Sequence, residues 1–122
     1  MRVRGPLAVL FVSVSLSGAA LAVDPPYEPE MERLAEILGS LYFLAPLCAP
    51  GEEDWRQEMA DLVQLDQPDE DRQQRLYGAF NSGYTAYARL YRACTVSARE
   101  ALTRLLMEAE NSAREIHTRF AE

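Results

Sequence analysis

Apolar side chains recur every three or four residues in four separate stretches of this chain, and this spacing constrains the fold more than any other feature. Such spacing places residues i, i+3, i+4 and i+7 on one face of an amphipathic helix. The stretches span residues 29–45, 52–65, 68–94 and 97–120. No segment of useful length alternates with the period of two that is typical of a strand. The sequence therefore predicts an all-α fold.

The first 22 residues have the pattern of a secretory signal peptide. Arg2 and Arg4 give a positive start, residues 7–16 are apolar apart from two serines, and residues 20–22 supply a small-x-small cleavage site. Because the apolar run is shorter than the roughly 20 residues that span a bilayer, we expect cleavage after Ala22 and no membrane insertion of the mature chain. Residues 23–29 contain three prolines and predict an extended leader. A single helical domain should follow over residues 30–122.

Two cysteines, Cys48 and Cys94, have 45 residues between them. In an exported protein, an isolated pair of this kind is more typical of a disulfide than of two buried thiols. Short connections favour helices that alternate in direction, so the ends of the first and third helices should lie at the same pole. The two cysteines occupy those ends. We therefore expect a compact antiparallel four-helix bundle with a Cys48–Cys94 disulfide, worth roughly 4 kcal/mol in the chain-entropy model.

The charge balance excludes nucleic acid as a partner. The chain has 12 arginines and no lysine against 19 acidic residues, which gives a formal charge of -7. Binding to phosphate backbones depends on basic patches, and none is present. Anionic lipid is a poor electrostatic partner for the same reason.

Few residues of this chain are of the kinds that catalyse reactions or bind metals and cofactors. His117 is the only histidine, and the spacings of metal, haem, thiol-exchange and phosphate-binding motifs are missing. We therefore expect no metal, no cofactor and no catalytic site. Glu32 and Glu36 share a helix face and leave one route open, hydrolysis of a glycosidic bond by two carboxylates. Such a pair is equally typical of any acidic helix, so a hydrolase acting on envelope glycan is the least favoured function.

The third stretch carries an unusually aromatic face. Four tyrosines share it: Tyr77, Tyr84, Tyr87 and Tyr91. Gly83 lies among them and permits the close approach of a neighbouring helix. The rings either fill the core, which is the commoner arrangement, or form a binding surface. Phe43 lies outside the apolar stripe of the first helix and presents the same two alternatives. The candidate partner-binding residues are therefore Phe43, Tyr77, Tyr84 and Tyr91.

Local signals also predict helix ends and surface ion pairs. Ser97 and Glu100 are spaced as a capping box. Four acid-first pairs have i,i+4 spacing: Glu52–Arg56, Glu100–Arg104, Glu110–Arg114 and Glu115–Arg119. The three pairs of the last helix are typical of a solvated face rather than a site.

Several short motifs together resemble one family. They are residues 38–44 with Cys48, Trp55–Arg56 with Met59, residues 80–84 and residues 91–95. Over residues 27–120 the chain resembles short exported alphaproteobacterial proteins that have no assigned function. The resemblance implies a periplasmic location and supplies no activity.

Two functions follow for a chain without a catalytic constellation. We expect a non-catalytic periplasmic module that binds another cell-envelope protein through its helical surface. The alternative is a carrier of a small apolar ligand that uses space between the Tyr87 face and the first helix.

Overall fold

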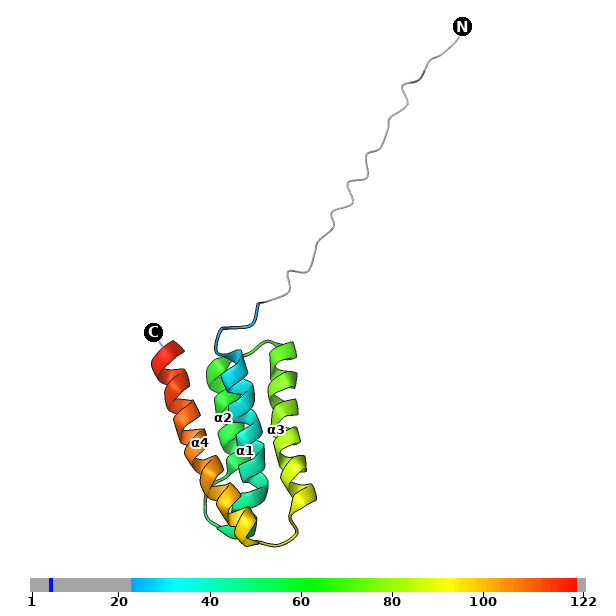
Figure 1. Ribbon diagram of the computed structural model, residues 1–122. Coiled ribbons are helices and arrows are strands. Elements are labelled where there is room, and N and C mark those ends of the chain that lie inside the picture. The colour runs from blue at the N-terminus through cyan, green and yellow to red at the C-terminus, as the bar shows by residue number, and fades with distance from the viewer. Residues whose placement is uncertain (1–4, 6–22, 121–122) are drawn as a thin grey trace.

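The computed structural model describes Gly5 and residues 23–120, and that part of the chain contains helices and no strand. The helices are α1 (Glu28–Cys48), α2 (Trp55–Asp66), α3 (Glu70–Leu90) and α4 (Val96–Phe120). They run alternately up and down beside one another (Figure 1). The predicted all-α bundle is confirmed. The predicted signal peptide, residues 1–22, lies outside the described residues apart from Gly5.

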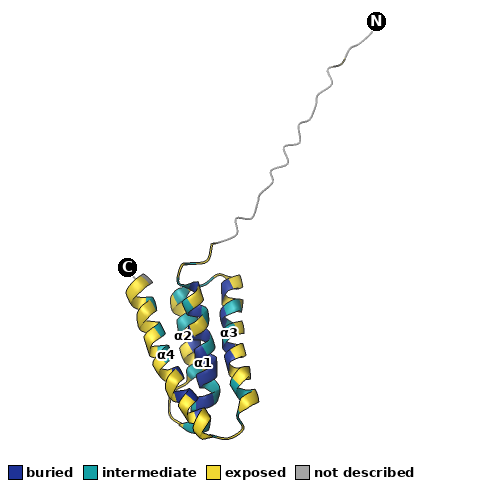
Figure 2. Ribbon diagram, in the orientation of Figure 1, coloured by how far each residue is buried: buried dark blue, intermediate teal, exposed yellow. Residues whose placement is uncertain are grey.

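α1 is the central helix of the bundle. It packs against each of the other three helices, whereas those three have few close contacts with one another. Figure 2 accordingly shows α1 buried along most of its length, while the outer helices are exposed on one side. Among the helices in the described residues, none has the length and apolar character needed to cross a membrane.

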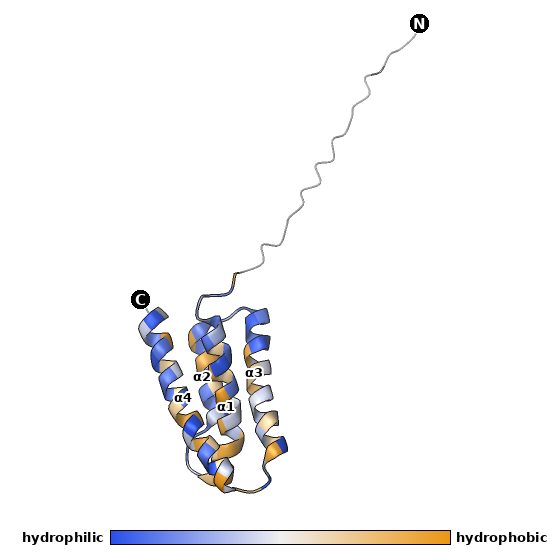
Figure 3. Cartoon of the chain, in the orientation of Figure 1, coloured by the Kyte–Doolittle hydropathy of each residue, from blue (hydrophilic) through white to orange (hydrophobic). Residues whose placement is uncertain are grey.

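Two apolar clusters fill the space around α1. The first joins α1 to α2 and α3 and contains Met31, Leu34, Ala35, Leu38, Met59, Leu76 and Phe80. The second joins α1 to α4 and contains Ile37, Leu41, Leu44, Ala98, Ala101, Leu102 and Leu105. Burial of these side chains is the main force that holds the helices together. Figure 3 shows that α3 changes from hydrophilic at its start to more hydrophobic at its end.

Glycines bring α1 and α3 into backbone contact. A Cβ on Gly83 would overlap the Glu36 carbonyl and lie 2.7 Å from the Ser40 hydroxyl oxygen. A Cβ on Gly39 would overlap the Phe80 carbonyl in the same way. The close approach predicted from Gly83 is therefore confirmed, and Gly39 is its counterpart on α1.

Side-chain caps set the starts of three helices. The carboxylate of Asp54 accepts hydrogen bonds from the backbone N–H groups of residues 56 and 57, and Asp69 accepts one from residue 72. The Thr95 hydroxyl accepts from the Ala98 N–H at 3.0 Å. The predicted capping box at Ser97 is therefore wrong, because α4 begins at Val96 and Thr95, two residues before Ser97, caps it through the Ala98 amide.

The ends of two helices differ from the sequence prediction. α3 ends at Leu90 rather than near residue 94, because Tyr91 has an extended backbone with φ -127° and ψ 130°. The released segment carries Cys94 to Cys48, with a Cα–Cα distance of 5.1 Å, and the predicted disulfide is confirmed. α1 begins at Glu28, one residue before Pro29, so part of the predicted extended leader is helical.

Candidate partner-binding surface

An aromatic cluster lies where α1 and α3 face each other. The Tyr84 ring of α3 lies between two rings of α1, with centroid distances of 5.5 Å to Tyr42 and 5.6 Å to Phe43. Phe43 meets Tyr84 edge-on at 89°, which is a favoured geometry for aromatic pairs. Tyr42 also lies 5.8 Å from the buried ring of Phe80. The cluster therefore extends from the core to the surface, where Tyr84 is 38% exposed.

A groove of about 440 Å³ opens beside this cluster. We call it the Phe43 groove; its lining is Tyr42, Phe43, Pro46, Leu47 and Tyr84. None of these side chains is charged, and three are aromatic. Pro46 lies inside α1 and has no N–H, so the Tyr42 carbonyl lacks its usual helical donor. The groove thus presents packed aromatic rings and no charged side chain.

The structure brings together two of the four predicted binding residues. Phe43 and Tyr84 both line the Phe43 groove. Tyr77 is instead half-buried against the first apolar cluster. Tyr91 stacks on Tyr87 with a centroid distance of 6.4 Å, and both rings pack against the second cluster. The tyrosine face therefore divides between core packing and surface along the length of α3.

A buried charge network lies at the opposite end of the bundle from the disulfide. The Arg72 guanidinium donates to a carboxylate oxygen of Glu28 at 2.7 Å and to one of Asp66 at 2.6 Å. The Tyr27 hydroxyl donates to the other oxygen of Asp66 at 2.6 Å. Residue exposures of 3% for Glu28 and 7% for Arg72 place this network in the interior. It ties the start of α1 to the end of α2 and the start of α3.

A second arginine holds the segment before α1. Arg75 donates to both carboxylate oxygens of Asp24, at 2.6 and 2.9 Å, and to Glu32 at 3.1 Å. The hydrogen bond from Arg75 lowers the pKa of Asp24. Burial raises the pKa of Glu28 despite the opposing effect of Arg72. The leader is therefore attached to α3 through charged side chains.

The charge network was missed in the sequence, although one signal was present. Arg72 precedes Leu76 by four residues and so lies on the inward face of α3. A charged residue at such a position needs a partner when it is buried. The identity of that partner depends on how α1 and α2 end, which periodicity does not specify.

The two glutamates considered as a catalytic pair are bound to arginines, and the only histidine is exposed. Glu32 pairs with Arg75 at 3.1 Å, and Glu36 pairs with Arg33 at 3.0 Å. His117 is exposed on α4. Within residues 23–120, no cluster of three or more His, Cys, Asp or Glu side chains could hold a metal ion. Glu32 and Glu36 therefore each have an arginine as ionic partner.

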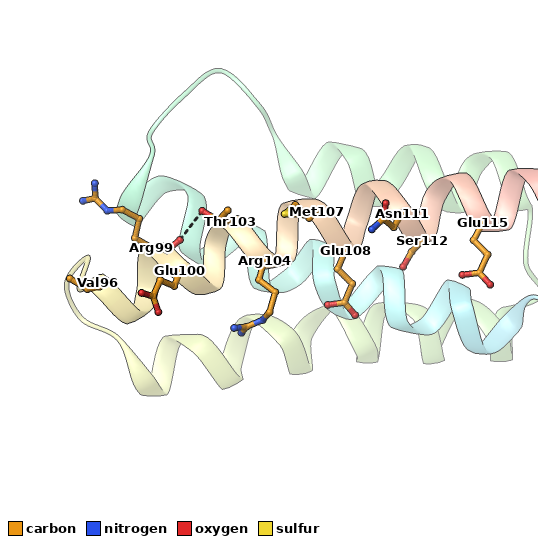
Figure 4. Close-up of a pocket in the computed structure, with 10 residues that line it drawn as sticks. All are labelled: Val96, Arg99, Glu100, Thr103, Arg104, Met107, Glu108, Asn111, Ser112 and Glu115. Carbon is orange, nitrogen blue, oxygen red and sulfur yellow. Dashed lines mark hydrogen bonds between the residues drawn. The ribbon is translucent and has the colours of Figure 1, made fainter.

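The outer face of α4 carries a long, shallow hollow (Figure 4). All ten of its lining residues project from this one helix, including Arg104, Met107 and Glu108. A hollow with a single wall cannot enclose most of a ligand's surface, as binding pockets do. Two of the three predicted ion pairs form on this helix, Glu110–Arg114 and Glu115–Arg119. The face therefore fits the predicted solvated surface.

Fold and site together define a small, disulfide-linked helical bundle with an aromatic groove. The chain belongs to the family described as a protein of unknown function, DUF2385, which matches residues 26–120. The matched range includes all four helices and both cysteines. No curated protein and no solved structure matches the chain.

Proposed function

We propose that this protein is a non-catalytic periplasmic module that binds another cell-envelope protein through the Phe43 groove. The observation that carries the proposal is the edge-on contact of Phe43 with Tyr84 beside an uncharged groove. Tyrosine is enriched among residues that dominate binding energy, and rings already held by packing lose little entropy on binding.

The disulfide supports the proposed location. Disulfides persist in oxidising compartments, of which the bacterial periplasm is one. The Cys48–Cys94 bond joins the end of α1 to the segment after α3, and these are the two helices that build the groove. The bond therefore limits how far the two walls of the groove can separate.

Quantitative co-purification from cells that naturally make the protein tests the proposal. We expect a protein that is captured by the wild type and reduced at least tenfold in yield by Phe43→Ala or Tyr84→Ala, about 1.4 kcal/mol. Met107→Ala, on the outer face of α4, is the matched control because Met107 is 62% exposed and lies outside the groove. Equal capture by all four proteins would contradict the proposal.

The two other functions have less support. The Tyr87 ring packs against the second apolar cluster, so the space considered for a small apolar ligand holds that ring. Glu32 and Glu36 are each paired with an arginine, so each carboxylate already has an ionic partner. Binding of a protein remains the function that a specific feature of the surface favours.

A further inference from the structure

A second groove lies on the other side of Pro46. It has a volume of about 430 Å³ and is formed by the end of α1, the segment that connects α1 to α2, and α4. Its apolar lining includes Trp55, Leu102 and Leu106. Leu102 is buried and Leu106 is 39% exposed, so the apolar lining reaches from the core to solvent. We call this the Trp55 groove.

The charges around the Trp55 groove have one sign. Glu52 and Glu53 are exposed at its edge, and no basic residue lines it. The predicted Glu52–Arg56 ion pair does not form, because α2 begins only at Trp55 and Glu52 therefore lies outside the helix. Within the described residues neither carboxylate has an ion-pair partner. An apolar groove with uncompensated negative charge favours an occupant that is both apolar and cationic.

We propose that the Trp55 groove binds a polypeptide segment in which a large apolar side chain is adjacent to arginine or lysine. The apolar side chain lies against Trp55 and Leu106, and the cation faces Glu52 and Glu53. The indole ring adds a cation–π contribution where the cation lies over its face.

The position of Pro46 is the reason for choosing a polypeptide. Pro46 lines both the Trp55 groove and the Phe43 groove, so the two grooves adjoin. A single protein partner can therefore occupy both, whereas a small amine would fill only one. This inference rests on the proposed function, because it specifies a further part of the same partner.

Trp55 provides a direct probe, because it is the only tryptophan in the chain. Its fluorescence is measured on the oxidised protein during titration with acetyl-Leu-Arg-Leu-amide and, in parallel, with acetyl-Leu-Glu-Leu-amide. We expect a saturable change with the arginine peptide and no saturation with the glutamate peptide up to about 10 mM. The Glu52→Gln/Glu53→Gln variant should bind the arginine peptide roughly three- to tenfold more weakly. Raising the salt to about 1 M should weaken wild-type binding because it screens exposed charges.

Met107→Ala serves as the matched control, since Met107 is 62% exposed on α4 and does not line the Trp55 groove, and it should bind the arginine peptide as the wild type does. An equal response to both peptides, or no saturable response to either, would overturn the inference. If the peptides fail while Phe43→Ala still abolishes capture of the partner protein, the proposed function stands and only the inference falls. If the peptides do not bind and Phe43→Ala does not reduce capture of the partner, both the inference and the proposed function are wrong.

Discussion

Gly83 of α3 lies so close to Ser40 of α1 that a Cβ at position 83 would come within 2.7 Å of the serine hydroxyl oxygen. That hydroxyl donates to the Glu36 carbonyl at 2.9 Å, and the same carbonyl would overlap the added carbon. The clash therefore involves backbone of α1, which cannot move without displacing the helix. The contact positions Tyr84, the next residue, beside the rings of α1.

Gly83→Ala should destabilise the protein although alanine has the better helix propensity. We expect a loss of about 1–3 kcal/mol or more in the free energy of unfolding, because overpacking forces the two helices apart. Gly78→Ala is the matched control, since Gly78 is in the same helix and nothing lies within 4 Å of an added Cβ. It should gain up to about 1 kcal/mol. Urea unfolding of both variants decides the point, and a stabilised Gly83→Ala would contradict the packing.

Arg72→Leu should be one of the most damaging single changes at a charged residue. It removes the partner of two buried carboxylates, Glu28 and Asp66. Breaking a buried pair in this way costs about 3–5 kcal/mol. The control is Arg33→Leu, which removes a bidentate but largely exposed pair with Glu108 and should cost about 1 kcal/mol or less. Similar losses in thermal unfolding of the two variants would show that the network around Arg72 is not buried in solution.

The difference in stability between the wild type and the Glu28→Gln variant should depend on pH in a defined direction. Burial raises the pKa of Glu28 above its ordinary value of 4.5, so the folded state binds this proton more tightly than the unfolded chain. The resulting stability is fully present below 4.5 and is lost as the pH rises through the folded-state pKa. We expect the difference between the unfolding free energies of wild type and variant to be larger at about pH 3.5 than at about pH 7.

For Asp24→Asn, the stability difference from the wild type should change with pH in the opposite direction. Arg75 lowers the pKa of Asp24 below its ordinary value of 3.8, so the stability from this group is present above that value and is lost as the pH falls. Denaturant unfolding at several pH values measures both differences. If the difference in unfolding free energy between wild type and Glu28→Gln instead grew towards neutral pH, the pairing of Glu28 with Arg72 would outweigh the effect of its burial.

Removal of the disulfide should destabilise the bundle without changing its helical content. Replacing Cys48 and Cys94 together by serine should cost about 4 kcal/mol, because the unfolded chain regains the freedom of a long loop. Circular dichroism should show retained helix with a lower unfolding midpoint. Thr95→Ala, which removes the neighbouring cap of α4, should cost only about 1 kcal/mol. A double serine variant as stable as the wild type would contradict a structural role for the bond.

Helix number, order and the disulfide were predictable because each depends on local spacing. The 3.6-residue period identified the inward faces, and alternating helices place Cys48 and Cys94 at one pole. Helix ends were less predictable, because α3 stops at Leu90, where Tyr91 becomes extended, and no glycine or proline marks this point in the sequence. The central position of α1 also did not follow from periodicity, which gives a buried face but not the number of neighbours.

Only part of the candidate binding surface could be predicted from the sequence. Phe43 was identified because it lies outside its apolar stripe, and Tyr84 because it belongs to an aromatic face. Their contact depends on the crossing of α1 and α3 at Gly39 and Gly83, which is a property of tertiary packing. The Trp55 groove depends on the segment between two helices, whose path has no periodic signal.

Site-specific photocrosslinking in living cells tests the proposed binding surface most directly. Amine-reactive reagents are poorly suited because the chain has no lysine. p-Benzoylphenylalanine is placed either at Leu47, in the Phe43 groove, or at Met107, on the outer face of α4. We expect one covalent adduct with an envelope protein from position 47 that Tyr84→Ala removes, and none from position 107. Adducts of equal yield from both positions, or none from position 47, would contradict the proposed binding surface.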